Sequence, residues 1–224
     1  VLGAGSRSHP IPASSYHQSW AMAPAFRNGR DYGGTVLPLG PDWGGPLFLS
    51  QYPFLGIDPR GLRDAYADYG VQARAHALVN RHHCLTNPGG WAGYGPDCWG
   101  LTASDDPGGY VAHSPTEDTG TITPTAALGS FPFAPAEAMP VLRHLHDDLG
   151  ERIWGEAGFV DAFCPARDWV AESRLAIDQA PIVIGLENYR SGLVWRLVSG
   201  RPEIQRGLRA LGFTAPYLVE PAIA

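Results

Sequence analysis

Residues 177–198, with the sequence IDQAPIVIGLENYRSGLVWRLV, form the strongest structural pattern in the chain. From position 182 onward, apolar side chains recur at spacings of three and four residues, at Ile182, Leu186, Tyr189, Leu193 and Leu197. This spacing places them on one face of a helix. Gly200 and Pro202 follow, and these residue types typically stand just after a helix C-terminus. The pattern therefore predicts a helix over 180–198.

Weaker patterns of the same kind predict four more helices. Residues 62–84 have a mostly three-to-four apolar spacing, and short helices are expected at 14–21 and 203–211. Pro135 suits the first position of a helix, whose apolar stripe continues until Gly150 ends it. The Gly- and Pro-rich stretches 3–55 and 89–133 are expected to be loop, because no strand pattern of comparable strength occurs. We expect an all-α fold.

Composition limits the class of protein. The chain has 224 residues, of which 44% are hydrophobic and 17% charged, which is typical of one globular domain over 1–224. The net charge of -6 and the dispersed arginines argue against nucleic-acid binding. No apolar run approaches the roughly 20 residues that a membrane span needs. Seven Trp suit stacking on sugar rings, but they suit a core equally well.

The run GYGPDCWGLTASD at 93–105 concentrates groups that can perform chemistry. It holds two carboxylates, Asp97 and Asp105, together with the indole of Trp99 and the hydroxyl of Ser104. Glycoside cleavage needs two carboxyl groups, one protonated and one ionised, and apolar faces for the sugar. The same residues also suit an ordinary turn in which carboxylates accept hydrogen bonds from backbone amides. Both interpretations stay open at this point.

Two further carboxylates lie in or beside the strongest helix. Asp178 is either its N-cap or a carboxylate at a helix mouth, where backbone amides lower the pKa and favour the role of a base. Glu187 has apolar neighbours on the helix, so its charge needs a partner, and Arg190 is close enough to supply one. This pair is either structural or in contact with substrate. Asp58 and Arg60 form a comparable local pair.

Several long runs are similar, in order and spacing, to the glucoamylase-like domain family. The runs are 2–12, 48–62, 95–105, 120–127 (GTITPTAA), 154–163 (WGEAGFVDAF), 177–182 (IDQAPI) and 187–195 (ENYRSGLVW). That family contains β-1,2-glucanases and the cyclising domain of cyclic β-1,2-glucan synthases. The match covers nearly the whole chain.

The resemblance implies an (α/α)6 toroid, with this chain corresponding to its C-terminal half. It implies a bacterial glycoside hydrolase, periplasmic or secreted, that acts on β-glucan or its oligosaccharides and above all on β-1,2-linked glucan. It implies no metal and no organic cofactor. The expected partners are the glucan substrate and the N-terminal half of the toroid, supplied as a separate chain or segment. That half would carry a Glu just upstream of the residue that matches Val1.

The residue patterns and the resemblance together suggest site residues. The candidate acid or base groups are Asp97 and Asp178, with Glu187 third, and we expect the first two to face one cavity. The candidate substrate-binding residues are Asp58, Arg60, Trp99, Ser104, Asp105, Gln179 and Arg190. The sequence departs from the family at or beside these residues. Pro96-Asp97 stand where many members have Glu-Asn before Cys-Trp, and Ala180 follows IDQ where many have Gly.

Two other function classes remain open. One is a non-catalytic glycan-binding or assembly half that needs a partner chain, which a cleft without carboxylates would favour. The other is a lyase or phosphorylase on the same toroid, which a Tyr or His base near the scissile bond would favour. In either case, half a toroid should leave an open apolar flank, because its inner helices are covered on one side only.

Overall fold

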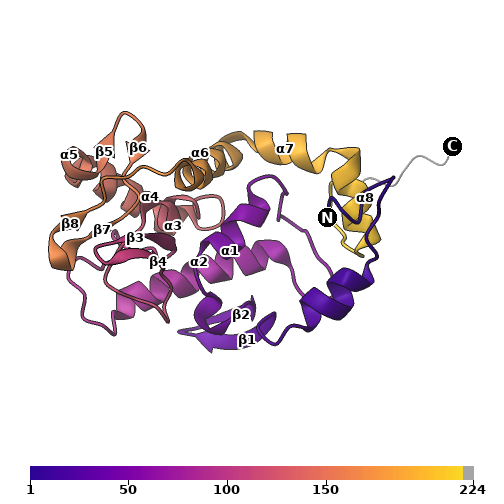
Figure 1. Ribbon diagram of the computed structural model, residues 1–224, viewed down its shortest axis with the longest axis horizontal. Coiled ribbons are helices and arrows are strands. Elements are labelled where there is room, and N and C mark those ends of the chain that lie inside the picture. The colour runs from indigo at the N-terminus through magenta and orange to yellow at the C-terminus, as the bar shows by residue number, and fades with distance from the viewer. Residues whose placement is uncertain (219–224) are drawn as a thin grey trace.

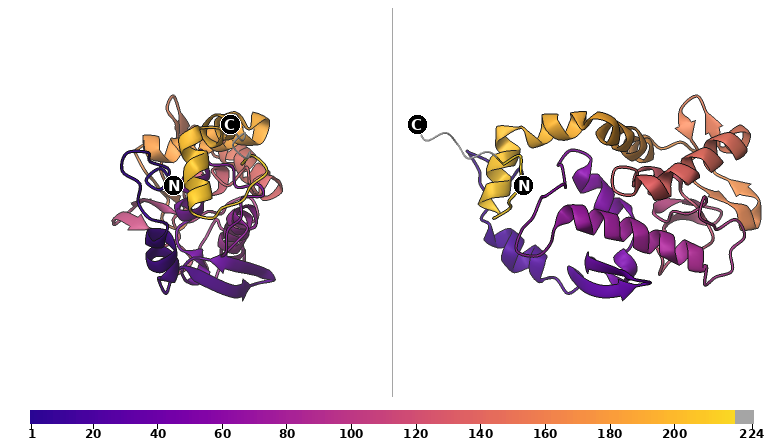
Figure 2. Two further views of the ribbon diagram at one scale, coloured as in Figure 1. Left: turned by 90° about the vertical axis from the view of Figure 1, so that its right-hand side faces the viewer. Right: turned by 180° about the vertical axis from the view of Figure 1, so that it is seen from behind.

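The computed structural model describes residues 1–218 and shows an elongated molecule built mainly of helices (Figure 1). The longest helix, α2 (Tyr69–Thr86), runs through its middle. Helices α6 (Ala176–Ser191), α7 (Leu193–Ser199) and α8 (Pro202–Ala210) follow one another along one edge. Views along the long axis and from behind show α8 beside the N-terminus, at one end of the molecule (Figure 2).

The remaining helical elements are short. They are η1 (Ser15–Ser19), η2 (Trp20–Met22), η3 (Asp42–Gly44), α1 (Phe48–Gln51), η4 (Tyr52–Phe54), α3 (Pro124–Leu128), α4 (Pro135–Arg143), η5 (His144–Asp148), α5 (Gly150–Ile153) and η6 (Pro165–Arg167). Helix α4 begins at Pro135 and α8 at Pro202, close to the expected starts. Gly150 begins α5 instead of ending the preceding helix, because the wider turn η5 comes between them.

Four two-stranded antiparallel sheets were not expected from the sequence. They pair β1 (Arg27–Tyr32) with β2 (Thr35–Leu39), β3 (Ala103–Asp106) with β4 (Gly109–Ala112), β5 (Trp154–Gly155) with β6 (Gly158–Phe159), and β7 (Phe163–Cys164) with β8 (Trp169–Val170). The stretches expected to be loop are therefore partly strand. Tight glycine turns explain the first sheet, since Gly33 and Gly34 both have positive φ. The fold is mainly helical with small sheets.

The long helices also begin and end differently from the expectation. Helix α2 starts at Tyr69, because the Asp68 side chain accepts a hydrogen bond from the Val71 amide at 3.1 Å and caps the helix there. The helix expected over 180–198 is two helices, divided at Gly192, whose φ is 65°. Local capping and backbone geometry set these limits more strongly than apolar spacing does.

One proline in α6 leaves a backbone carbonyl available to another segment. Pro181 lies inside the helix and has no N–H with which to bond the carbonyl four residues earlier. That carbonyl, of Ile177, instead accepts a hydrogen bond of 3.4 Å from the hydroxyl of Tyr52. The start of α6 is thereby joined to η4, which is more than a hundred residues away in the sequence.

Three apolar clusters hold the described residues together, the smallest of which packs Tyr32 and Leu37 of the first sheet against Ala75 and Val79 of α2. The largest one surrounds Trp99 and includes Leu101, Leu128, Leu145 and Phe159, from α3, the segment after α4 and the hairpins. A second cluster joins α2 to α8. Outside the clusters, α6 and α7 expose several apolar side chains: Ile177, Val183, Tyr189, Leu193 and Leu197. The open apolar flank of a half toroid stays a prediction.

None of the helices within residues 1–218 combines the length and apolar character that crossing a membrane requires.

Candidate active site

Three aspartates from separate segments meet at one edge of α6. Asp105 lies on β3, Asp161 between β6 and β7, and Asp178 is the third residue of α6. Asp161 is 1% exposed and Asp178 is 4% exposed, whereas Asp105 is half-buried. Carboxyl groups as buried as these are uncommon unless they are paired or have a shifted pKa. The cluster is therefore a candidate site for chemistry.

Hydrogen bonds to the backbone and to one serine hold the cluster together. The Asp105 amide donates to Asp161 Oδ2 at 2.7 Å, and the Asp161 amide donates to the Ser173 carbonyl at 3.0 Å. The Ser173 hydroxyl in turn donates to Asp105 Oδ2. These three hydrogen bonds link Asp105, Asp161 and Ser173 in turn, so they fix β3, the turn after β6 and the segment before α6 against one another.

Two tyrosines stand beside Asp178. The Tyr52 hydroxyl shares its one proton between Asp178 Oδ1 and the Ile177 carbonyl, each at 3.4 Å. Tyr110 on β4 is close enough to act on the aspartate electrostatically. Burial, followed by the negative field of Asp178, raises the pKa of Tyr52. Tyr52 therefore remains a neutral donor. Tyr110 is largely exposed, so its ring lies at the surface beside the buried Asp178.

Asp178 holds its proton more tightly than an ordinary aspartate. Burial is the largest cause, and the neighbouring carboxyl groups of Asp161 and Asp105 add to it, so that the pKa of Asp178 rises to about 7. Burial also raises the pKa of Asp161, although the Asp105 amide opposes the change. The expectation of a lowered pKa at a helix mouth is wrong, because desolvation beside a second carboxylate outweighs the helix amides. A carboxyl of this kind suits proton donation near neutral pH.

Ser104, His113 and Asp106 form a buried polar network next to Asp105. Ser104 Oγ is 3.1 Å from His113 Nδ1, and His113 Nε2 is 3.3 Å from Asp106 Oδ2. Burial would raise the pKa of Asp106, but hydrogen bonds from the Gly108 amide, Thr119, Thr121 and His113 lower it to about 2. Ser104 has no exposed surface, so its prediction as a substrate-binding residue is wrong. It supports the β3–β4 hairpin instead.

The structure does not bring Asp97 to this cluster. Asp97 is exposed in the tight turn between Gly95 and Cys98, and its carboxylate has no hydrogen bond or ion pair within residues 1–218. The groups that act most strongly on Asp178 are Tyr52, Asp161 and Asp105. Asp105, at the other end of the 93–105 run, occupies the place that was expected for Asp97.

Trp99 is part of the core. Its side chain is 0% exposed, and its indole N–H donates to the Glu137 carbonyl at 3.3 Å. A ring without exposed surface cannot stack on a sugar. The prediction of a sugar-stacking face at Trp99 is therefore wrong, and the indole instead fixes the 93–105 run against α4.

Glu187 and Arg190 form a solvated ion pair. Arg190 Nη2 lies 2.6 Å from Glu187 Oε2, but the arginine side chain is 78% exposed. Hydrogen bonds from Ser191 and then Arg190 lower the pKa of Glu187. The structural alternative for this pair therefore fits the geometry, and the idea of a charge buried among apolar neighbours does not.

The other predicted binding residues also lie outside the cluster or support it. Arg60 Nη2 lies 2.7 Å from Asp58 Oδ2, and the guanidinium stacks over the Trp195 ring at 4.7 Å. Both groups belong to the loop before α2. Gln179 Nε2 donates to the Phe159 carbonyl at 2.9 Å. Gln179 therefore holds α6, which carries Asp178, against β6, which precedes Asp161.

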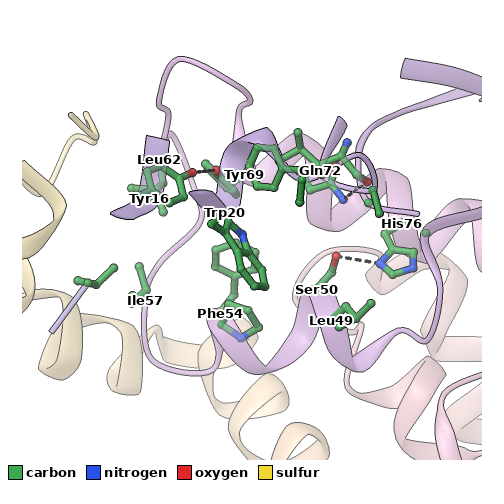
Figure 3. Close-up of a pocket in the computed structure, with 18 of the residues that line it drawn as sticks. Tyr16, Trp20, Leu49, Ser50, Phe54, Ile57, Leu62, Tyr69, Gln72 and His76 are labelled. Atoms are coloured by element: carbon green, nitrogen blue, oxygen red, sulfur yellow. Dashed lines mark hydrogen bonds between the residues drawn. The ribbon is translucent and has the colours of Figure 1, made fainter. Parts of the chain in front are cut away.

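A cavity of about 470 Å³ lies elsewhere, between the N-terminal segment, α1 and α2 (Figure 3). Its lining is mostly apolar, and its polar groups bond to one another: Tyr16 to Tyr69 at 2.8 Å and His76 to Ser50 at 2.8 Å (Figure 3). None of the three clustered aspartates lines it. A sugar needs several unpaired polar partners, so this cavity is a poor candidate for the glycan site.

Sequence reasoning missed Asp161, Tyr52 and Ser173. Asp161 lies inside the run WGEAGFVDAF, which carried the family resemblance, so that run was the available signal. Tyr52 lies in the similar run 48–62. No local spacing connects either residue to Asp178, since their contacts depend on the tertiary fold.

The geometry therefore defines a class: a mainly helical protein with a cluster of buried carboxyl groups at the start of a helix. Comparison with protein families is more specific. The family described as "Putative glucoamylase" matches residues 1–202, so the chain belongs to that family.

Characterised relatives and solved structures agree with this assignment. The chain is 40% identical over 204 residues to an exo β-1,2-glucooligosaccharide sophorohydrolase (non-reducing end) of Parabacteroides distasonis, covering 89% of this chain and 28% of the relative. It resembles a putative glucoamylase from Bacteroides uniformis with a TM-score of 0.95 and 55% identity, covering 97% of this chain and 53% of the other. An endo-β-1,2-glucanase from Chitinophaga pinensis, in complex with sophorotriose and glucose, gives a TM-score of 0.93 and 46% identity, covering 96% and 53%.

The chain therefore spans about half the length of these solved structures and less than a third of the curated relative.

Proposed function

We propose that this chain forms the part of a β-1,2-glucan hydrolase that carries the acidic cluster. The observation that carries the proposal is the meeting of Asp105, Asp161 and Asp178, with one of the three protonated near neutral pH. Glycoside hydrolysis needs a carboxyl that donates a proton and another that is ionised. The names of the relatives, a β-1,2-glucooligosaccharide sophorohydrolase and an endo-β-1,2-glucanase, support β-1,2-linked glucan as the substrate.

The roles follow from the surroundings of each carboxyl. Asp178 is the proton donor, because burial keeps it protonated and the exposed ring of Tyr110 lies beside it at the surface. Asp105 is the second carboxylate and is half-buried, with one oxygen bound by Ser173. The hydroxyl of Tyr52 orients Asp178 from the side.

The test compares variants of the complete protein on linear β-1,2-glucan. Loss of a general acid typically costs about 10²–10⁴ in rate, so Asp178→Asn should lower kcat by that factor. Asp97→Asn and the matched surface variant Asp147→Asn, whose side chain is 65% exposed, should remain near wild type. The absence of glucan hydrolysis by the wild type would contradict the proposed function. Wild-type kcat in Asp178→Asn would contradict the site.

We also propose that the rest of an (α/α)6 toroid packs on the exposed apolar side chains of α6 and α7. Their exposure and the match to only about half of each solved relative support this proposal. Sedimentation of the chain should show self-association through these side chains, and a Val183→Ser/Leu197→Ser variant should weaken it. A monomer with no tendency to associate would count against the idea.

The family resemblance alone supports a periplasmic or secreted location, which we propose on that basis. Fractionation of the producing cells tests it, and activity found only in the cytoplasm would refute it.

A further inference from the structure

We propose that Asp161 and Asp178 share a single proton, and that Asp161 is a positioning residue which keeps this proton on Asp178 until it is donated. The reaction step rests on the proposed glycosidase function. The shared proton itself does not, because it is a property of the folded protein.

The unpartnered oxygens of the two carboxyl groups carry the argument. Asp161 Oδ2 accepts from the Asp105 amide, and Asp178 Oδ1 accepts from Tyr52. The remaining oxygens, Asp161 Oδ1 and Asp178 Oδ2, are both buried and have no hydrogen-bond partner within residues 1–218. An unmet buried polar atom is costly, and two in adjacent groups are more so.

One proton between the two groups removes this cost. The carboxyl groups lie within hydrogen-bonding reach of each other, and each alters the proton affinity of the other. Two ionised carboxylates this close repel strongly in a buried site, whereas one O–H donor satisfies the second oxygen. The singly protonated pair is therefore the stable state, as in other carboxyl pairs that share a site.

The surroundings decide which carboxyl keeps the proton. The Asp105 amide donates to Asp161 at 2.7 Å, and His113 acts favourably on its negative charge, so both stabilise ionised Asp161. Asp178 has only the long 3.4 Å bond from Tyr52, and the carboxylates of Asp161 and Asp105 oppose its ionisation. The other titratable group beside it is Tyr110. The proton therefore rests on Asp178.

The donation step balances without any additional reactant except water. The O–H bond of Asp178 breaks and an O–H bond to the glycosidic oxygen forms, while the electron pair of the carbon–oxygen bond goes to that leaving oxygen. Water adds to the sugar carbon and releases a proton, which restores the shared state. Asp161 does not touch the sugar. It sets how readily Asp178 gives up and regains the proton.

Carboxyl ¹³C NMR of the complete protein tests the shared proton directly. In the wild type, one aspartate carboxyl should remain protonated up to about pH 7. In Asp161→Asn, the carboxyl of Asp178 should ionise at least about one pH unit lower, because the neighbouring negative charge is gone and the amide can donate to the carboxylate. Asp147→Asn is the matched control and should change nothing.

The reciprocal variant keeps the test decisive if Asp161→Asn does not fold. In Asp178→Asn, neither side chain of the pair should titrate near pH 7, because the proton that is held to that pH belongs to Asp178 and Asp161 already ionises beside a neutral partner in the wild type. Two wild-type carboxyl groups that are both ionised below pH 5, or an Asp178 titration that Asp161→Asn leaves in place, would overturn the proposal.

Kinetics separate the positioning role from a merely structural one. In Asp161→Asn, the alkaline limb of the pH–rate profile should move to lower pH while KM stays near wild type. An unmoved limb together with a raised KM would overturn the positioning role. If the wild type does not hydrolyse β-1,2-glucan, the proposed function fails, whereas the NMR titration still decides whether the proton is shared.

Discussion

Replacing Trp99 with Ala tests most directly whether the 93–105 run belongs to the core. A fully buried Trp removes about 200 Å² from water, which at about 25 cal/mol per Å² corresponds to about 5 kcal/mol. Trp to Ala changes in other cores cost about 3–5 kcal/mol. Trp99 is 0% exposed and also loses its hydrogen bond to the Glu137 carbonyl. We therefore expect the free energy of unfolding to fall by about 3–5 kcal/mol.

Urea denaturation followed by circular dichroism measures this change at constant slope. Trp99→Phe is the matched control, because it keeps an aromatic ring in place and should lose less than half as much stability. It should also leave the KM for glucan unchanged, since the indole does not reach the surface. A loss below about 0.5 kcal/mol in Trp99→Ala, together with weaker glucan binding, would refute the reasoning and restore Trp99 to the site.

Three further predictions follow from the described contacts. The raised pKa of Asp178 stabilises the fold below about pH 4, and this contribution disappears as pH rises through about 7. A shift of about three pKa units, at about 1.36 kcal/mol each, corresponds to about 4 kcal/mol. Solvent beside the cluster screens part of this, so we expect the unfolding free energy of the wild type, relative to Asp178→Asn, to fall by about half as much, about 2 kcal/mol, between pH 4 and 8. Arg190→Ala should leave the urea midpoint unchanged, because the arginine is solvated, and a clear drop would show a buried pair. Gly207→Ala should lower the melting temperature by several degrees, because the added Cβ would stand 2.1 Å from the Val1 carbonyl oxygen. Gly150→Ala is the control and should leave the melting temperature unchanged, because its Cβ would meet no atom within 4 Å.

Signals confined to a few neighbouring residues predicted parts of the fold well. Pro135 and Pro202 mark true helix starts, because a proline at the first position acts through its own backbone. Gly192 was overlooked within an otherwise continuous apolar spacing, and its positive φ divides the helix there. The hairpins were missed because strands of two to six residues are too short for alternation to be distinct.

The candidate site was predicted less completely. Asp105 and Asp178, both predicted to line one cleft, do lie close enough to affect each other, and their role in a site stays a prediction. Their roles were not predictable, because the pKa of Asp178 depends on Asp161 and on burial. Asp97 was favoured because it shares a run with Trp99, but neighbours in sequence can point to opposite environments. Only the tertiary fold shows that one is exposed and the other is core.

The hydrogen bonds that assemble the aspartate cluster also determine when it can form during folding. The Tyr52 contact to Asp178 joins residues 126 positions apart, and the Asp105 contact to Asp161 joins residues 56 apart. Closing such long loops costs chain entropy that local helices do not incur. Helices α2 and α6 can therefore form early, while the aspartates come together late. In a refolding experiment, recovery of the elevated Asp178 titration should trail recovery of helical signal.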